Sequence, residues 1–200
     1  MLGYLKTHKM RFSIQVFLLI FFFACSQRTV NRVEPEEEIN LSGRWNDTDS
    51  RLVANKMTAD FLASEKYKEY AMGLGKKPAI ILGTIKNKTT EHIDASNYLK
   101  KFELAIYNSG VAELVESDEQ RDKLRIERVQ QQEFSDPSTI SQWGKEVGAN
   151  LILFGEMTSE TDIYNNKRVV NYQTTLFLTD METNKRIWFG QHEIKKFIKN

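Results

Sequence analysis

The sequence predicts an α/β fold of the α+β kind, in which a single domain holds a mixed β-sheet with helices packed on it. Patterns typical of helices and strands alternate over residues 41–157, and strand patterns separated by turn residues close the chain. About 175 residues follow a leader segment, which suits one domain with a sizeable core. The expected order is helix, strand, helix, strand, helix, helix, strand, strand, strand.

The leader begins with basic residues and continues as an apolar run. Lys9 and Arg11 precede the unbroken apolar residues 16–23, and the small residue Ala24 then stands directly before the one cysteine of the chain, Cys25. Basic, apolar and small residues in this order are typical of a secretory signal. The sequence therefore predicts export from the cytoplasm.

The position of the cysteine resembles the lipobox of bacterial lipoproteins, in which the thiol takes a diacylglyceryl group before the signal is cleaved. We expect a lipoprotein signal peptide at residues 1–24, a lipidated cysteine (Cys25) with a flexible tether at 25–40, and a globular domain at 41–200. Two alternatives stay open. One is an uncleaved membrane anchor, although the apolar run is shorter than the ~20 residues of a spanning helix. The other is a secreted protein with a free thiol.

The tether sets where the domain can work. Residues 26–40 are polar, contain an acidic run and show no apolar period, which indicates a flexible segment. Fully extended, its ~15 residues span at most about 50 Å. Ser26 after the cysteine resembles the signal that sorts lipoproteins to an outer membrane. We therefore expect a domain that faces the periplasm and stays close to the outer membrane.

Composition excludes several kinds of partner and site. The chain has 28 basic and 27 acidic residues, a formal net charge of +1, and no block of one sign. Nothing in this charge pattern indicates binding to nucleic acid. A single cysteine, assigned to lipid, can build neither a disulfide framework nor a thiolate metal site.

The folded domain is expected to begin at residue 41 and to hold a helix up to residue 63. Its apolar face is formed by Leu52, Val53, Met57, Phe61 and Leu62. Residues with short side-chain oxygens precede this face and can cap free N–H groups: Asp47, Thr48, Asp49 and Ser50. The Asp-Thr-Asp triplet could instead start a cation site, although Arg51 stands where a calcium loop would place further oxygen ligands.

The remaining elements follow from periodicity and turn residues. Strands are expected at residues 79–85, 111–115, 150–157, 168–180 and 186–197, and helices at 94–109, 117–131 and 136–148. Gly110 supplies a C-terminal cap position, residues 117–120 match a capping box, and Pro137 suits a first helical position. The apolar run at residues 151–154 predicts a strand that is covered on both faces.

The helix expected at residues 117–131 is charged nearly all round. Such a helix is typical of the solvated rim of a domain. A surface that faces a partner is the alternative interpretation.

No constellation of catalytic residues is found in the sequence. His8 lies in the leader, His92 in a polar loop and His192 on a strand, and no second His or Cys stands at metal-ligand spacing. A Gly-x-Ser-x-Gly nucleophile motif is missing as well. We therefore expect a protein that is not an enzyme and that holds neither a metal nor a cofactor.

Three stretches of the domain together resemble one known family. They are LSGRWNDTDSRLVA at residues 41–54, SQWGKEVGANLILFGE at 141–156 and LTDMETNKRIWFGQHEIKK at 178–196. These stretches resemble the LpoB family of outer-membrane lipoproteins, which activate penicillin-binding proteins. The last two are similar, in looser form, to the secretion lipoprotein CsgG and to the N-terminal domain of TolB, which share the α/β domain type.

The resemblance implies a non-catalytic domain that binds a class A penicillin-binding protein, a bifunctional peptidoglycan synthase. It would stimulate glycan polymerisation and cross-linking by that synthase. Two other classes stay open. One is a secretion or envelope-assembly subunit like CsgG. The other is a lipoprotein that binds a small molecule or glycan, with Trp45, Trp188 and Tyr164 as aromatic platforms.

A protein that acts by binding needs an exposed contact surface, and the tight turn at residues 165–166 offers one. Aromatic and Arg side chains are typical interface anchors. We therefore expect the contact on the polar side of the strands beside this turn, at Asp162, Tyr164, Asn165, Lys167 and Arg168. The membrane is expected to be contacted through the lipid anchor, and the domain is expected to be a monomer.

Overall fold

The structure is a computed structural model that describes residues 28–140 and 146–199. The chain divides into two units, residues 1–37 and 38–200. Of the first unit, the described residues 28–37 hold a turn but neither a helix nor a strand. None of the described helices has the length and apolar character that a membrane crossing requires.

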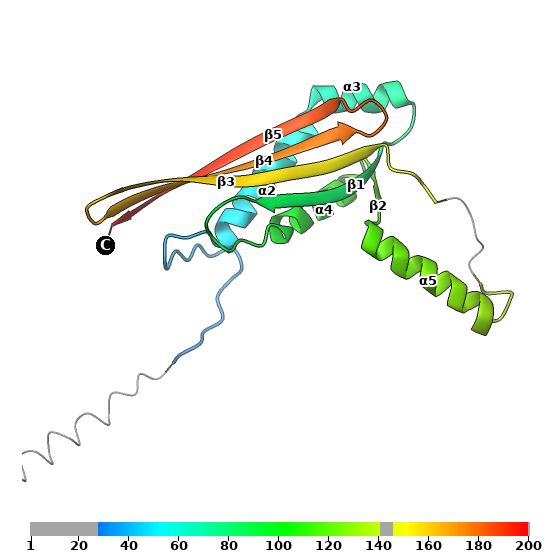
Figure 1. The fold of residues 1–200 in the computed structure, drawn as a ribbon, viewed down its shortest axis with the longest axis horizontal. Coiled ribbons are helices and arrows are strands. Elements are labelled where there is room, and N and C mark those ends of the chain that lie inside the picture. The colour runs from blue at the N-terminus through cyan, green and yellow to red at the C-terminus, as the bar shows by residue number, and fades with distance from the viewer. Residues whose placement is uncertain (1–27, 141–145, 200) are drawn as a thin grey trace, which may run out of the picture. The chain divides into compact units, whose positions relative to one another are not determined.

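All described helices and strands belong to the second unit (Figure 1). In chain order they are α2 (Asp47–Ala63), α3 (Glu65–Leu74), β1 (Ala79–Asn87), α4 (Ser96–Ser109), β2 (Glu113–Val115), α5 (Asp118–Phe134), β3 (Leu151–Tyr164), β4 (Lys167–Asp180) and β5 (Arg186–Lys199). The strands form one sheet in the order β2-β1-β3-β4-β5. Strands β2 and β3 run parallel to β1, whereas β4 and β5 continue the sheet in antiparallel pairs. The predicted fold class, a mixed sheet with helices packed on it, is confirmed.

Two helices differ from the prediction. The sequence analysis did not predict α3. This helix begins directly after Ser64, which ends α2 and caps α3: its hydroxyl accepts a hydrogen bond from the N–H of Tyr67 at 3.3 Å. The helix expected at residues 136–148 does not begin at Pro137, and residues 146–148 are not helical either. Residues 141–145 of that prediction, with Trp143, lie outside the described residues. Within the residues that the structure describes, the order therefore begins with two helices, and one helix, α5, lies between β2 and β3.

Local hydrogen bonds hold a short turn after Asp136, where the helix was expected. The Asp136 carboxylate accepts from the N–H of Ser138 at 2.8 Å and from its hydroxyl at 2.7 Å. This side-chain turn satisfies the backbone without a helix. Helix α5, in contrast, begins after Ser117 as expected, but that serine makes no side-chain capping bond, so the predicted capping box does not form. None of the residues of α5 is buried, which confirms a solvated helix.

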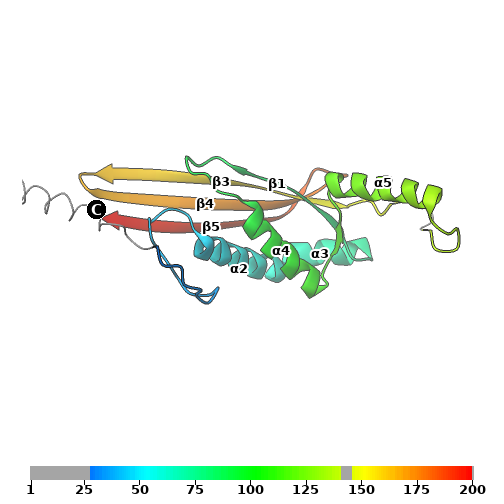
Figure 2. The same cartoon turned by 90° about the horizontal axis from the view of Figure 1, so that it is seen from below.

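Helices α2, α3 and α4 pack on one face of the sheet, here called the covered face (Figure 2). The other face carries none of the described helices and is called the open face. In β3 this difference follows the alternation of side chains. Leu151 and Leu153 are buried under the helices, whereas Ile152 and Phe154 are half-buried on the open face. The prediction that residues 151–154 are covered on both faces is therefore wrong.

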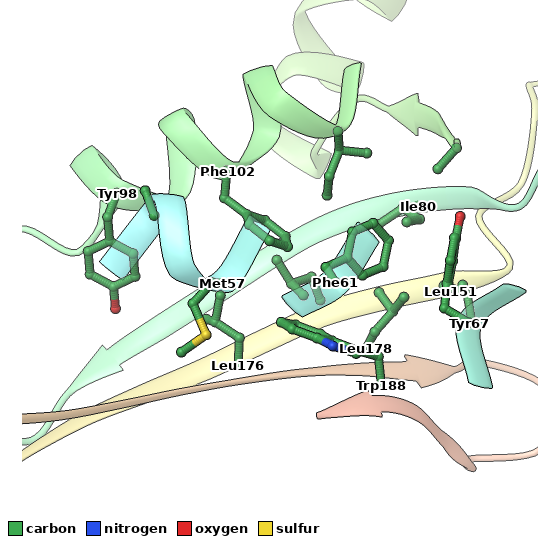
Figure 3. Close-up of a cluster of buried hydrophobic side chains, with 14 of the residues drawn as sticks. Met57, Phe61, Tyr67, Ile80, Tyr98, Phe102, Leu151, Leu176, Leu178 and Trp188 are labelled. Carbon is green, nitrogen blue, oxygen red and sulfur yellow. The ribbon is translucent and has the colours of Figure 1, made fainter. Parts of the chain in front are cut away.

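The core of the covered face is an aromatic cluster (Figure 3). The ring of Phe61 in α2 lies 5.4 Å from that of Trp188 in β5, and Phe102 of α4 stacks on Trp188 at 5.9 Å. Gly190 lies under the indole, where a Cβ would clash with the Trp188 ring. The cluster fixes α2 and α4 on β5.

Candidate functional site

The long hairpin of β3 and β4 carries the surface that the sequence predicted. The two strands pair without interruption from Leu151 and Asp180 to Tyr164 and Lys167, and Asn165 takes a positive φ of 52° in the turn. The strands are thus longer than expected toward the turn. Tyr164 is 74% exposed at the end of this hairpin.

The predicted contact residues do not all lie together. Side chains alternate between the faces along a strand, so Asp162, Tyr164 and Lys167 share the open side of the hairpin, with Asn165 in the turn. Arg168 points to the covered side instead, where its guanidinium lies 3.7 Å from the Glu91 carboxylate and is half-buried. Four of the five predicted residues therefore form an exposed tip, whereas Arg168 lies half-buried on the covered side.

Glu91 joins three segments on the covered side of the hairpin. Its carboxylate accepts a hydrogen bond of 2.6 Å from the Tyr172 hydroxyl and one of 3.2 Å from the backbone N–H of Trp45. Burial, followed by this hydrogen bond, raises the pKa of Tyr172 well above its ordinary range. The Trp45 ring also meets the Tyr172 ring edge-on at 5.4 Å. These contacts fasten the hairpin to the segment before α2.

The beginning of α2 makes a second polar contact with the sheet, at β5. The helix is capped by Asn46, not by one of the four predicted candidates, and Asp49 completes a capping box by accepting from the Asn46 N–H at 2.9 Å. The Asp49 carboxylate also lies 2.5 Å from the Lys196 ammonium of β5, with both side chains nearly buried. Among the described residues, no three His, Cys, Asp or Glu side chains come together to hold a metal ion.

The open face carries a row of aromatic residues that the sequence reasoning missed. Phe154 pairs with Phe177, and Phe177 pairs with Phe189, so the three rings lie on three adjacent strands. The guanidinium of Arg186 lies 4.5 Å from the centre of the Phe177 ring and 5.5 Å from that of Phe189. Alternation of side chains along β4 and β5 could have predicted that Phe177 and Phe189 share a face. The same alternation would have placed Arg186 on the covered face.

An irregularity in the sheet explains the position of Arg186. The pairing of β4 with β5 shifts between Leu178, opposite Trp188, and Thr179, opposite Arg186. Such a β-bulge re-aims the side chains on one side of it. As a result Arg186 and Trp188, two residues apart, lie on opposite faces of the sheet.

Two of the three predicted aromatic platforms are not free. Trp188 is 5% exposed in the core. Trp45 is half-buried, and its indole N–H donates to the Ser50 hydroxyl at 2.9 Å. Tyr164 is the exposed member of the predicted set.

Comparison with known proteins places this geometry in a family. The model of the peptidoglycan-synthase activator LpoB matches residues 49–194. The chain belongs to the LpoB family. The match contains β1 to β4 and most of β5, and with them Glu91, the hairpin tip and the aromatic row of the open face. A search of the curated proteins found no match.

Solved structures of LpoB proteins are similar at low identity. The C-terminal domain of LpoB from Salmonella enterica is 15% identical, with 70% of this chain and 96% of that chain covered and a TM-score of 0.38. The corresponding Escherichia coli domain is 18% identical, with 68% and 96% covered and a TM-score of 0.32. A lipoprotein from Neisseria meningitidis is 12% identical, with 60% and 83% covered and a TM-score of 0.37.

Membership of the LpoB family describes a regulatory activator rather than an enzyme. Two of the histidines have described positions. His92 is exposed in a loop, and His192 is half-buried on β5. His8 and the expected lipid attachment site, Cys25, lie outside the described residues.

Proposed function

We propose that this protein binds a class A penicillin-binding protein and activates its synthesis of peptidoglycan from the periplasmic side of the outer membrane. The observation that carries the proposal is the match of the LpoB activator family across residues 49–194. A long sheet with one face free of the described helices supports it, because such a face leaves a broad surface for a protein partner.

Activation follows from preferential binding to one state of the synthase. A ligand shifts a conformational equilibrium only by the difference between its affinities for the two states. A tenfold stimulation therefore requires about 1.4 kcal/mol of additional binding free energy to the active state. The domain supplies this free energy through surface contacts and needs no reactive group of its own.

The hairpin tip is the first contact that we assign to the synthase. Asp162, Tyr164 and Lys167 present carboxylate, aromatic and ammonium groups beside the turn at Asn165. Tyr164 is the anchor, because a large exposed ring gains most from burial in a partner. Arg168 acts indirectly by holding β4 against Glu91.

The test uses the full chain in detergent with the class A synthase of the same organism. The protein should raise the rate at which the synthase polymerises glycan chains from lipid II. Tyr164→Ala should weaken this stimulation severalfold, whereas Tyr107→Ala, which removes a ring that is 70% exposed on α4, should not. A wild-type protein that neither binds the synthase nor changes its rate would refute the proposal.

Anchoring is the second part of the proposal. The thiol of Cys25 carries the lipid, and the acyl chains provide stable membrane association. Cys25→Ser should leave the precursor unprocessed by the lipoprotein signal peptidase and abolish that association. Mass spectrometry of the membrane fraction decides the matter, because an unmodified Cys25 in the mature protein would exclude lipid anchoring.

A further inference from the structure

The open face holds an apolar patch whose composition is typical of a binding site. We define the open-face patch as Ile152, Phe154, Phe177, Phe189 and Arg186. Phe189 is 50% exposed, and the rings of Phe154 and Phe177 lie 6.0 Å apart and are half-buried. Three phenylalanines in a row across a sheet face would normally be covered, since apolar surface gains free energy when it leaves water.

Polar residues border the patch toward the hairpin tip. Glu156 of β3 pairs with Thr175 of β4, and Thr175 pairs with Gln191 of β5. Glu156 itself forms an ion pair with Lys88 at 2.5 Å. An apolar centre with a polar rim is the usual anatomy of a protein–protein interface.

Arg186 is the charged group of the patch. Its guanidinium lies within cation–π distance of two rings, and no ion pair with a carboxylate of the described residues is formed. Stacking holds the planar group in place, so little conformational entropy remains to be lost when it binds. A guanidinium also presents two parallel N–H donors that match a carboxylate.

We propose that the open-face patch binds a segment of the synthase that presents an Asp or Glu carboxylate beside apolar side chains. The carboxylate accepts two hydrogen bonds from Arg186, and the apolar side chains cover Phe177 and Phe189. Charge complementarity selects this partner, because the exposed Arg186 cation stacks over two apolar rings and forms no ion pair with a carboxylate of the described residues. The inference rests on the proposed function and adds a second contact to the hairpin tip.

The test measures the dissociation constant of the full chain in detergent for the immobilised class A synthase of the same organism. Arg186→Ala should raise the dissociation constant at least about tenfold, as expected for a central interface anchor. Arg186→Lys should raise it nearly as much, because lysine keeps the charge but loses the stacked planar fork. Phe189→Ala should also raise it about tenfold.

Two matched variants serve as controls. Lys185→Ala removes the neighbouring cation in the turn before β5, and Tyr107→Ala removes an exposed ring from α4. Both should leave the dissociation constant within about twofold of the wild-type value, which is the scale of a contact outside the interface. Thermal unfolding of every variant shows whether the fold is kept.

The outcomes separate the inference from the proposed function. If the wild type binds and stimulates the synthase and Arg186→Ala does so equally well, the open-face patch is not a contact and the function stands. If the wild type does not bind, both fall. Binding to isolated glycan strands that is lost in Arg186→Ala would identify a sugar ligand in place of a protein carboxylate. Self-association of the wild type that Arg186→Ala abolishes would identify a second copy, and either result overturns the inference.

Discussion

Trp188 and Phe189 are neighbours in β5, yet the sheet separates them into two different environments. Trp188 is 5% exposed and packs between rings of α2 and α4 on the covered face, whereas Phe189 is 50% exposed on the open face. The two faces therefore use the same kind of side chain for different purposes. Aromatic residues of the covered face stabilise the domain, and those of the open face are available to a partner.

The open face retains its rings at a cost to stability. Leaving half of a phenylalanine side chain in water forgoes on the order of 1 kcal/mol of burial free energy. A polar residue at position 189 would avoid exposed apolar surface and would keep the alternation of apolar and polar side chains along β5. The difference between the faces teaches that a contiguous group of exposed rings, rather than the presence of a single ring, marks the binding surface.

The largest expected effect is on the covered face. Trp188→Ala removes the ring that joins Phe61 and Phe102, and it should lower the free energy of unfolding by about 3–5 kcal/mol. Urea denaturation followed by circular dichroism measures this change. A loss below about 1 kcal/mol would mean that the aromatic cluster does not hold the helices on the sheet.

The next effect concerns the ion pair that joins α2 to β5. Asp49→Ala leaves the nearly buried Lys196 ammonium with the Arg44 carbonyl, to which it donates at 2.8 Å, but without a carboxylate. The change also breaks the capping box, so a loss of about 3 kcal/mol is expected. Asp47→Ala removes an exposed acid from the same helical turn and should cost about 0.5 kcal/mol. Equal losses in the two variants would contradict the role of the buried ion pair.

A third effect depends on pH. The Asp180 carboxylate is 7% exposed and accepts from the Tyr70 hydroxyl at 2.6 Å and from the N–H of Thr183 at 2.7 Å. The Tyr70 hydrogen bond, followed by those from Thr183, lowers the pKa of Asp180 below its ordinary value. Asp180→Asn should therefore cost about 2 kcal/mol at pH 7.

The sign of the pH dependence follows from the lowered pKa. A carboxyl with a lower pKa in the folded state stabilises the protein above its unfolded pKa of about 3.9, and this contribution is lost as the pH falls through the folded value. The difference between wild type and Asp180→Asn should shrink when unfolding is measured at progressively lower pH below about 4. A difference that stays constant down to pH 2 would exclude a stabilising Asp180 carboxylate.

Periodicity in the sequence predicted the covered face well. The expected inward residues Val53, Met57 and Phe61 of α2 are buried, although Leu52 of the same predicted face is 41% exposed. Tyr98, Phe102 and Ile106 of α4 are buried as well, and Gly110 takes the left-handed C-cap. Such residues follow the helical period because one face of each helix must leave water.

The open side could not be predicted with the same accuracy, since its features depend on contacts between distant segments. Arg168 was assigned to the exposed tip, but alternation along β4 turns it to the covered side, where it meets Glu91, 77 positions earlier. Arg186 lies over Phe177 because of a bulge in the pairing of β4 with β5. Neither the distant ion pair nor the bulge has a signal in local periodicity.

A variant with a small expected effect on stability tests the central claim most directly. Phe189→Ala should change the free energy of unfolding by less than about 1 kcal/mol, because the ring is half exposed in the free protein. The same variant should lose most of its stimulation of glycan polymerisation by the class A synthase at concentrations where the wild type is effective. An unchanged fold with lost stimulation is the result that we predict. A variant that stimulates as well as the wild type would contradict the assignment of the open face to the partner.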